Sequence, residues 1–351
     1  MEAAMPIISE KVFRDLYKET QVVRELKPWK HLYDNDIFVL RFPADDEVYY
    51  CSIIGANDET YGVCCYRGGE GFHQLRKLII GELDQSKAVY IFDCLNVYYN
   101  NKSELQSEEI QIFEKYSIEP KGKNGYPNYM TFTPGLYPWP IEEKEALTLI
   151  KILKAVHEAV LPQYFKDESI HGAFERNVLP AFTETPDGKG KMNLEFSIEH
   201  FPDEIVQSPT DTPFRVDELK LANLKKAQLK RVEQIWEVGS FFSPEPVMEK
   251  ERPYFPNMII AVDVDSEFIF NIDIALYDSS FPLRVFNTLV ASFEKHEIIP
   301  ESLHFNDALT MAGAATLCQS LKIEIEMKEN LPHLETAKEE LFAMFTQDSQ
   351  H

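Results

Sequence analysis

The sequence predicts an α+β protein of two domains: an N-terminal antiparallel meander with helices, and a C-terminal ββαβαβα mixed sheet flanked by helices. Three observations lead to this prediction. Short runs of β-branched and aromatic residues alternate with amphipathic stretches at helical spacing. A proline-rich stretch, residues 179–213, separates the two halves. The length of 351 residues suits about two domains of roughly 150 residues each.

The N-terminal elements follow one another along residues 1–165 and end before the proline-rich stretch. Apolar residues at helical spacing predict the first helix, with Ser9 as its N-cap. Turn residues such as Pro43 and Gly55 separate the strands that come next. The expected elements are a helix over 9–26, strands over 37–42, 48–54 and 61–66, a helix over 72–83, a strand over 88–93, a helix over 103–116, a strand over 129–133 and a helix over 141–160.

The middle of the chain, residues 166–215, reads as a hairpin and a proline-rich connecting segment, with a turn at Asp187-Gly188. The pattern over 216–236 then becomes helical. This stretch carries the one basic cluster that could bind an anionic partner. It also begins the C-terminal domain, residues 216–351. The cluster consists of Lys220, Lys225, Lys226, Lys230 and Arg231.

The C-terminal elements alternate strands with helices. Two β-rich runs over 258–265 and 268–276, separated by Ser266-Glu267, predict a tight hairpin. A helix over 283–296, a strand over 302–305, a helix over 308–321, a strand over 323–327 and a helix over 334–345 follow. Because strands joined through helices run parallel, we expect part of this sheet to be parallel.

The charge balance limits the classes of partner that the protein can bind. The 58 acidic and 35 basic residues give a formal net charge of −23. Such a surface repels nucleic acid and anionic lipid, so we expect a protein partner and no membrane, with nucleic acid restricted to the 220–231 helix. The start of the chain has no apolar core of the kind a signal peptide needs, which favours a cytoplasmic protein. The 44% hydrophobic content excludes a disordered chain.

The cysteines and the familiar motifs give no catalytic signature. The odd number of cysteines, without a C-x-x-C pair, predicts buried free thiols and neither a disulfide framework nor a metal site. The glycine-rich nucleotide motifs, G-x-S-x-G and H-E-x-x-H are all absent. We therefore expect no cofactor and no metal. The cysteines are Cys51, Cys64, Cys65, Cys94 and Cys318.

The candidate binding residues are Trp29, Tyr66, Arg67, Gly68 and Gly71. In the run from Tyr66 to Phe72 a strand meets a helix, where glycine N–H groups and Arg67 could bind an anion. The alternative is that the glycines only form a sharp turn. Trp29 and Tyr66 belong to a group of aromatic residues in the first 70 positions that lines either a pocket or the core.

An alternative site uses Asp263, in the first strand of the C-terminal hairpin, and Asp307, directly after the strand over 302–305. Carboxylates on neighbouring strands can hold a divalent metal, as nucleases require. In outline this resembles a ribonuclease-H-like domain. It departs from one because the meander has two strands rather than three, and because no later helix supplies another acidic ligand. Asp307 also fits the N-cap of the following helix.

Two further groups of residues carry a resemblance to a family. The N-terminal half contains the stretches 27–39, 50–55, Tyr61-Gly62 and 66–71, and the C-terminal half contains 252–256, 259–263, 299–301 and 330–332. Together they resemble an uncharacterised bacterial two-domain family of unknown function. Some members of that family end in a SEC-C zinc module. The single cysteine after residue 100 excludes such a module here.

The sequence as a whole favours a cytoplasmic binding or interaction protein with no catalytic signature. The alternative is a metal-dependent nuclease or phosphodiesterase with a ribonuclease-H-like C-terminal domain, in which Asp263 and Asp307 would hold the metal.

Overall fold

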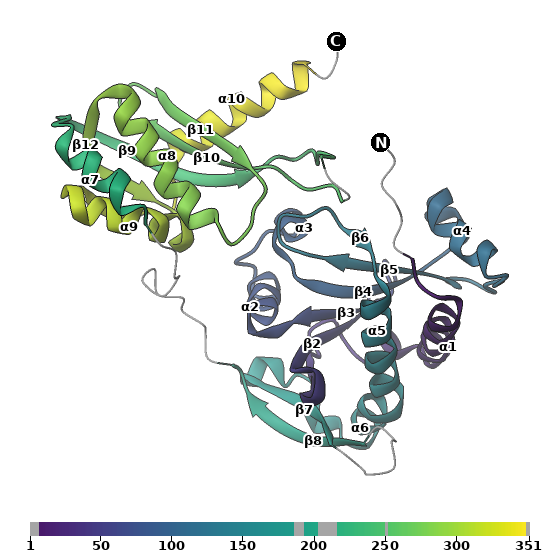
Figure 1. Cartoon of the computed structure of the whole chain (residues 1–351). Helices are drawn as coiled ribbons and strands as arrows, with labels where there is room; N and C mark the ends of the chain where they lie inside the picture. Colours follow the sequence, from purple (N-terminus) through teal and green to yellow (C-terminus); the bar gives the residue numbers. More distant parts are fainter. Residues whose placement is uncertain (1–6, 186–192, 203–215, 250–251, 349–351) are drawn as a thin grey trace. The chain divides into compact units, whose positions relative to one another are not determined.

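A computed structural model describes residues 7–185, 193–202, 216–249 and 252–348 of the chain. The chain divides into two units, Met1–Ile205 and Val206–His351. Each unit has a mixed sheet with helices (Figure 1), which confirms the α+β class. None of the helices in the described ranges combines the length and the apolar character needed to cross a bilayer.

The N-terminal unit is built on an eight-stranded sheet of order β6-β5-β4-β3-β2-β1-β7-β8. Its strands are β1 Phe38–Phe42, β2 Glu47–Ile54, β3 Gly62–Arg67, β4 Cys94–Asn100, β5 Tyr126–Phe132, β6 Trp139–Pro140, β7 Val178–Thr185 and β8 Asn193–His200. Strands β1, β2 and β3 form the expected antiparallel meander, and β4, β5 and β6 continue it. The hairpin expected after residue 166 is present as β7 and β8, but β7 pairs in parallel with β1. The hairpin is therefore part of this sheet, and its expected turn at Asp187-Gly188 lies outside the described residues. The residues 203–215 lie outside the described ranges.

Helices cover both faces of this sheet (Figure 1). They are α1 Glu10–Leu26, α2 Gly68–Ile79, α3 Ala88–Ile91, α4 Ser107–Lys115, α5 Glu143–Ala155 and α6 Leu161–Lys166. On one face α1 and α5 pack on a large core that includes Phe13, Leu149 and Cys65. On the other face α2 and the segment around α3 pack on a smaller core that includes Tyr66, Leu75 and Phe92.

The strand expected over 88–93 is wrong, because residues 88–91 form α3 and the strand begins at Cys94. A short 3₁₀ turn precedes α3, and the Asp84 carboxylate accepts a hydrogen bond from the Ser86 N–H there. This local cap starts a helical turn just before α3 and so overrides the strand propensity of Val89 and Ile91.

The C-terminal unit has a five-stranded sheet of order β11-β10-β9-β12-β13. Its elements are α7 Glu218–Lys226, β9 Lys230–Phe242, β10 Asn257–Asp263, β11 Ile269–Ala275, α8 Phe281–His296, β12 Ile298–Phe305, α9 Ala308–Leu321, β13 Glu324–Met327 and α10 Pro332–Asp348. Strands β9, β10 and β11 are antiparallel, whereas β12 and β13 run parallel to β9. Helices α7, α8 and α9 contribute to the core on one face and α10 to that on the other.

The single helix predicted over 216–236, and with it the basic helix over 220–231, is wrong in its second half. Helix α7 ends at Lys226, and the chain continues as the central strand β9. The unit therefore has the order βββαβαβα after α7 rather than ββαβαβα. The central residues of β9, from Trp236 to Gly239, are all buried. Val232, Ile235 and Trp236 recur at helical spacing, which is why the sequence pattern predicted a helix here.

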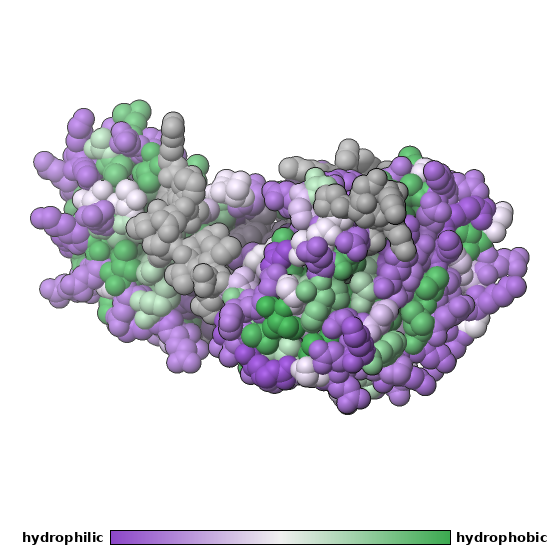
Figure 2. Space-filling model, turned by 90° about the horizontal axis from the view of Figure 1, so that it is seen from below, coloured by the Kyte–Doolittle hydropathy of each residue, from purple (hydrophilic) through white to green (hydrophobic). Residues whose placement is uncertain are grey.

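The surface of the described residues is mixed. Hydrophilic residues dominate the face shown in Figure 2, with apolar patches between them. Large apolar side chains that are exposed include Phe165, Phe196 and Ile198. Single exposed apolar residues are normal on a folded protein, so a binding site has to be sought in a cavity with polar groups.

Candidate ligand-binding pocket in the N-terminal unit

A row of polar side chains crosses the middle of the N-terminal sheet on the face of α2. The strand register places Ser52 of β2 opposite Cys64 of β3, and Cys64 opposite Asn96 of β4. All three residues are buried. Their neighbours Cys65 and Leu95 belong to the core on the other face, because successive side chains of a strand point to opposite faces. The sheet thus presents hydroxyl, thiol and amide groups side by side on one face.

This row forms the floor of a pocket of about 460 Å³. Its apolar wall comes from α2 and from the segment around α3. The loops before β1 and between β2 and β3 complete the rim. Tyr66 and Tyr98 also line the pocket. The apolar residues of the wall are Leu75, Leu78, Ile79, Ala88, Val89 and Phe92. Pockets of ~300–1,000 Å³ with an apolar lining and a few convergent polar groups are typical of small-molecule sites.

Gly62 makes room for one aromatic wall of this pocket. A Cβ atom at Gly62 would lie 3.2 Å from Cδ1 of Tyr98 and 2.8 Å from the Val97 carbonyl oxygen. The Tyr98 ring therefore packs beside β3 in the space that a side chain at position 62 would fill. A glycine is needed here for close packing and not for an unusual backbone angle.

The hydrogen bonds at the floor leave one atom without a partner. The Asn96 Nδ2 group donates to the Tyr98 hydroxyl at 2.7 Å. The Ser52 hydroxyl donates to the backbone oxygen of Asp34 at 2.6 Å. The Asn96 Oδ1 atom is buried and has no hydrogen-bond partner among the described residues. A buried acceptor without a partner costs about 1–3 kcal/mol, so its presence calls for a reason.

The floor of the pocket is uncharged at neutral pH. Burial raises the pKa of the Cys64 thiol, with a smaller contribution from neighbouring Cys65. Burial likewise raises the pKa of the Tyr66 and Tyr98 hydroxyls well above the ordinary value. None of the described residues that line the pocket is a histidine that could act as a base. Cys64 is therefore a neutral thiol and lacks the activation that a catalytic nucleophile needs.

Of the predicted binding residues, Tyr66 lines this pocket. Trp29 does not: it packs against Tyr61 and Tyr99 beside the core on the opposite face. Gly68 begins α2 with a positive φ of 61°. At Gly71 a Cβ atom would lie 3.1 Å from the Tyr66 carbonyl carbon, so this glycine lets α2 pack closely on β3.

Arg67 has its partners within the domain. Its guanidinium forms ion pairs with Asp93 and with Glu145, the latter at 2.7 Å, and donates to the Thr131 hydroxyl at 2.9 Å. Two carboxylates therefore already balance its charge. Its prediction as an anion-binding residue remains a prediction, and the contacts give Arg67 a structural role that ties β3 to β5 and α5.

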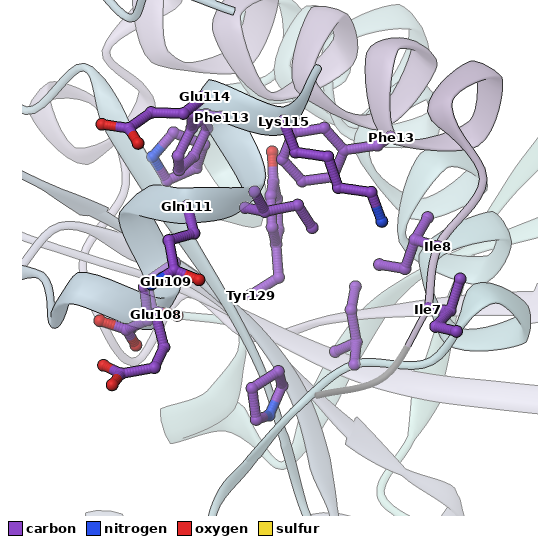
Figure 3. A pocket seen from close by; sticks show the side chains of 15 residues that line it. Ile7, Ile8, Phe13, Glu108, Glu109, Gln111, Phe113, Glu114, Lys115 and Tyr129 are labelled. Atoms are coloured by element: carbon purple, nitrogen blue, oxygen red, sulfur yellow. The ribbon is translucent and has the colours of Figure 1, made fainter. Parts of the chain in front are cut away.

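A second pocket of about 420 Å³ lies between the start of α1, α4 and β5. Figure 3 shows Glu108, Glu109 and Glu114 on the side opposite Ile7 and Ile8. Its Tyr129 hydroxyl lies 3.1 Å from the Thr20 hydroxyl and is hydrogen-bonded to it. Among the described residues that line this pocket, no buried side-chain polar atom lacks a partner. The pocket on the other face is therefore the stronger candidate.

In the C-terminal unit, Asp263 and Asp307 each stabilise their own part of the backbone. Asp263 ends β10 and accepts hydrogen bonds from the N–H and hydroxyl of Ser266. Asp307 is the N-cap of α9 and accepts a hydrogen bond from the Thr310 N–H at 2.7 Å, as the capping alternative expected.

The strand register places the strands that carry these two residues on either side of β9. The first strand of the meander is β9 and not β10, so the expectation of a two-stranded meander is wrong and the meander has three strands. Strand β10 is antiparallel to β9 and β12 is parallel to it. By register both strands end near the middle of β9, because Asp263 lies opposite Trp236, and Leu303 and His304 lie opposite Trp236 and Glu237. Among the described residues no group of three or more His, Cys, Asp or Glu is placed to hold a metal ion.

Two family models match the chain. Residues 13–179 match a domain of unknown function, DUF7309, and residues 220–342 match a second domain of unknown function, DUF6930. The chain therefore carries two distinct domains of unknown function. This confirms the predicted uncharacterised two-domain family. No curated protein and no solved structure gives a match, so the bacterial origin remains a prediction.

Asn96 and Tyr98 were missed because the strand that carries them was misplaced. With the strand expected over 88–93, both residues fell in a connecting segment. The available signal was the run Cys94-Leu-Asn-Val-Tyr-Tyr-Asn100, in which Leu95, Val97 and Tyr99 alternate with more polar residues. This alternation predicts a strand with one apolar face and one polar face, and Asn96 and Tyr98 lie on the polar face.

Proposed function

We propose that this protein is a binding protein whose N-terminal unit takes a small organic molecule in the pocket over Ser52, Cys64 and Asn96. The observation that carries the proposal is the Asn96 Oδ1 atom, which lies buried without a partner in a residue of the pocket floor. A ligand N–H or O–H that reaches the floor supplies the missing hydrogen bond and offsets the cost of burial. The neutral Cys64 thiol favours binding over covalent catalysis.

The test is a fragment screen on the full chain by ligand-observed NMR. A pocket-filling variant, Ala88→Phe, places a ring in the wall at α3. Its matched control, Gln111→Phe, adds the same ring at the second pocket. We expect fragments that bind the wild type and Gln111→Phe but not Ala88→Phe, while circular dichroism shows that all three proteins are folded. Fragments that bind Ala88→Phe as well as the wild type would contradict the proposed site.

A further inference from the structure

The charged residues that line this pocket are of one sign. They are Asp34, in the loop before β1, and Glu59, in the turn between β2 and β3. Both residues are exposed. None of the described residues that line the pocket is Lys, Arg or His. The two carboxylates thus set a negative potential at the pocket, in a chain whose formal net charge is already −23.

Two hydrogen-bond donors at the pocket floor are already used within the protein, whereas one acceptor is not. The Asn96 Nδ2 group and the Ser52 hydroxyl each donate a hydrogen bond within the protein, to Tyr98 and to the Asp34 backbone. The Asn96 Oδ1 atom has no partner among the described residues. An ionised carboxylate only accepts hydrogen bonds. The Asn96 Oδ1 atom and the two carboxylates are thus acceptors, which a ligand that brings donors would match.

The remaining surface of the pocket is apolar and aromatic. Side chains of α2 and of the segment around α3 supply aliphatic contacts, while Tyr66 and Tyr98 supply aromatic rings. Ring faces attract cations as well as apolar groups. A phosphate or a carboxylate would find no cation here and would meet two negative charges. This excludes anionic metabolites as good ligands.

From these three features we infer that the pocket binds a protonated amine with an apolar body. This inference rests on the proposed function. The ammonium group brings three donors and no acceptor, which fits acceptors such as Asn96 Oδ1 and the carboxylates of Asp34 and Glu59. The apolar body fills the space between the strands and α2. At about 460 Å³ the pocket accommodates a small molecule and not a folded partner.

Matched probes test this ligand class on the full chain. Tryptamine, tryptophol and indole-3-acetate share one ring system and carry an ammonium, a hydroxyl and a carboxylate. Phenylethyl and cyclohexylethyl compounds with the same three end groups extend the panel. Calorimetry and ligand-observed NMR measure their binding. We expect at least one amine to bind at least tenfold more tightly than its alcohol, no carboxylate to bind, and the amine's affinity to fall as salt is added.

Charge-removing variants then show where the preference arises. In the variant Asp34→Asn with Glu59→Gln, we expect the amine to lose at least tenfold in affinity while the alcohol is unaffected. The control variant Glu25→Gln with Glu82→Gln removes two exposed carboxylates that do not line the pocket and changes the net charge by the same amount. It should keep the amine preference.

The outcomes separate the two proposals. Equal affinity for amines and alcohols, or binding of no amine in the panel, overturns the inferred ligand class. The proposed function survives either result if neutral fragments still bind and Ala88→Phe abolishes that binding. It fails if Ala88→Phe leaves the binding of every fragment unchanged.

Discussion

The substitution Asn96→Leu separates a ligand-binding role of the pocket floor from a structural one. Leucine is close to asparagine in size, and position 96 is 3% exposed. The substitution removes the Oδ1 atom that lacks a partner, which stabilises the fold by about 1–3 kcal/mol. It also removes the hydrogen bond from Nδ2 to Tyr98, which costs about 0.5–1.5 kcal/mol.

The balance predicts that Asn96→Leu raises the free energy of unfolding of the N-terminal unit by about 1 kcal/mol and weakens ligand binding. Urea denaturation with circular dichroism and tryptophan fluorescence measures the stability, since Trp29 and Trp139 lie in this unit and Trp236 in the other. Calorimetry with the tightest-binding probe measures affinity, for which we expect at least a tenfold loss.

A matched control lies in the C-terminal unit. Asn257 is 1% exposed, and neither of its side-chain polar atoms has a partner among the described residues. Asn257→Leu should stabilise its own unit and leave binding to the N-terminal unit unchanged. The reasoning is refuted if Asn96→Leu lowers the free energy of unfolding by more than about 1 kcal/mol and leaves the affinity unchanged, because Asn96 would then be structural.

Three further substitutions test other parts of the account by urea denaturation. Arg67→Met leaves Asp93 and Glu145 without their cation. It should lower the free energy of unfolding of the N-terminal unit by about 2 kcal/mol, a value already reduced for the partial exposure of these groups. A loss below about 0.5 kcal/mol would show that the ion pairs contribute little. Gly313→Ala places a Cβ atom 2.6 Å from the Pro282 carbonyl oxygen and should cost about 2 kcal/mol despite the better helix propensity of alanine; a gain in stability would mean that α8 and α9 can move apart. Asp307→Ala removes the N-cap of α9 and should cost about 1 kcal/mol, equally with and without added Mg²⁺; a loss that appears only with Mg²⁺ would restore Asp307 as a metal ligand.

Local patterns predicted most of the fold. The α+β class, the strands β1 to β3 and the helices α1, α5, α8 and α9 all follow from periodicity and from turn residues. The failures have physical causes. At Val89 and Ile91 a cap at Asp84 overrides strand propensity. Strand β9 carries Val232, Ile235 and Trp236 at helical spacing, so its pattern resembles that of an amphipathic helix. The pairing of β7 with β1 joins segments far apart in sequence, which no local pattern reports.

The candidate site was only partly predictable, because it depends on register. Tyr66 was singled out from the sequence and does line the pocket. Its neighbours there are brought together by the pairing of β2, β3 and β4, which places Ser52, Cys64 and Asn96 in one row. A shift of the register by one residue would turn Asn96 to the other face. Arg67, which the sequence favours as a ligand-binding residue, is engaged by carboxylates that lie 26 and 78 residues away in the chain.

The most direct test of the central claim is methyl NMR of the full chain titrated with tryptamine. Methyl groups distinguish the two pockets of the N-terminal unit: Leu78, Ile79 and Val89 line the proposed site, whereas Ile8, Ile112 and Ile141 line the other. The account predicts chemical-shift changes in the first group only, and their loss in Asn96→Leu. Changes in the second group alone, or the same changes in Asn96→Leu as in the wild type, would contradict it.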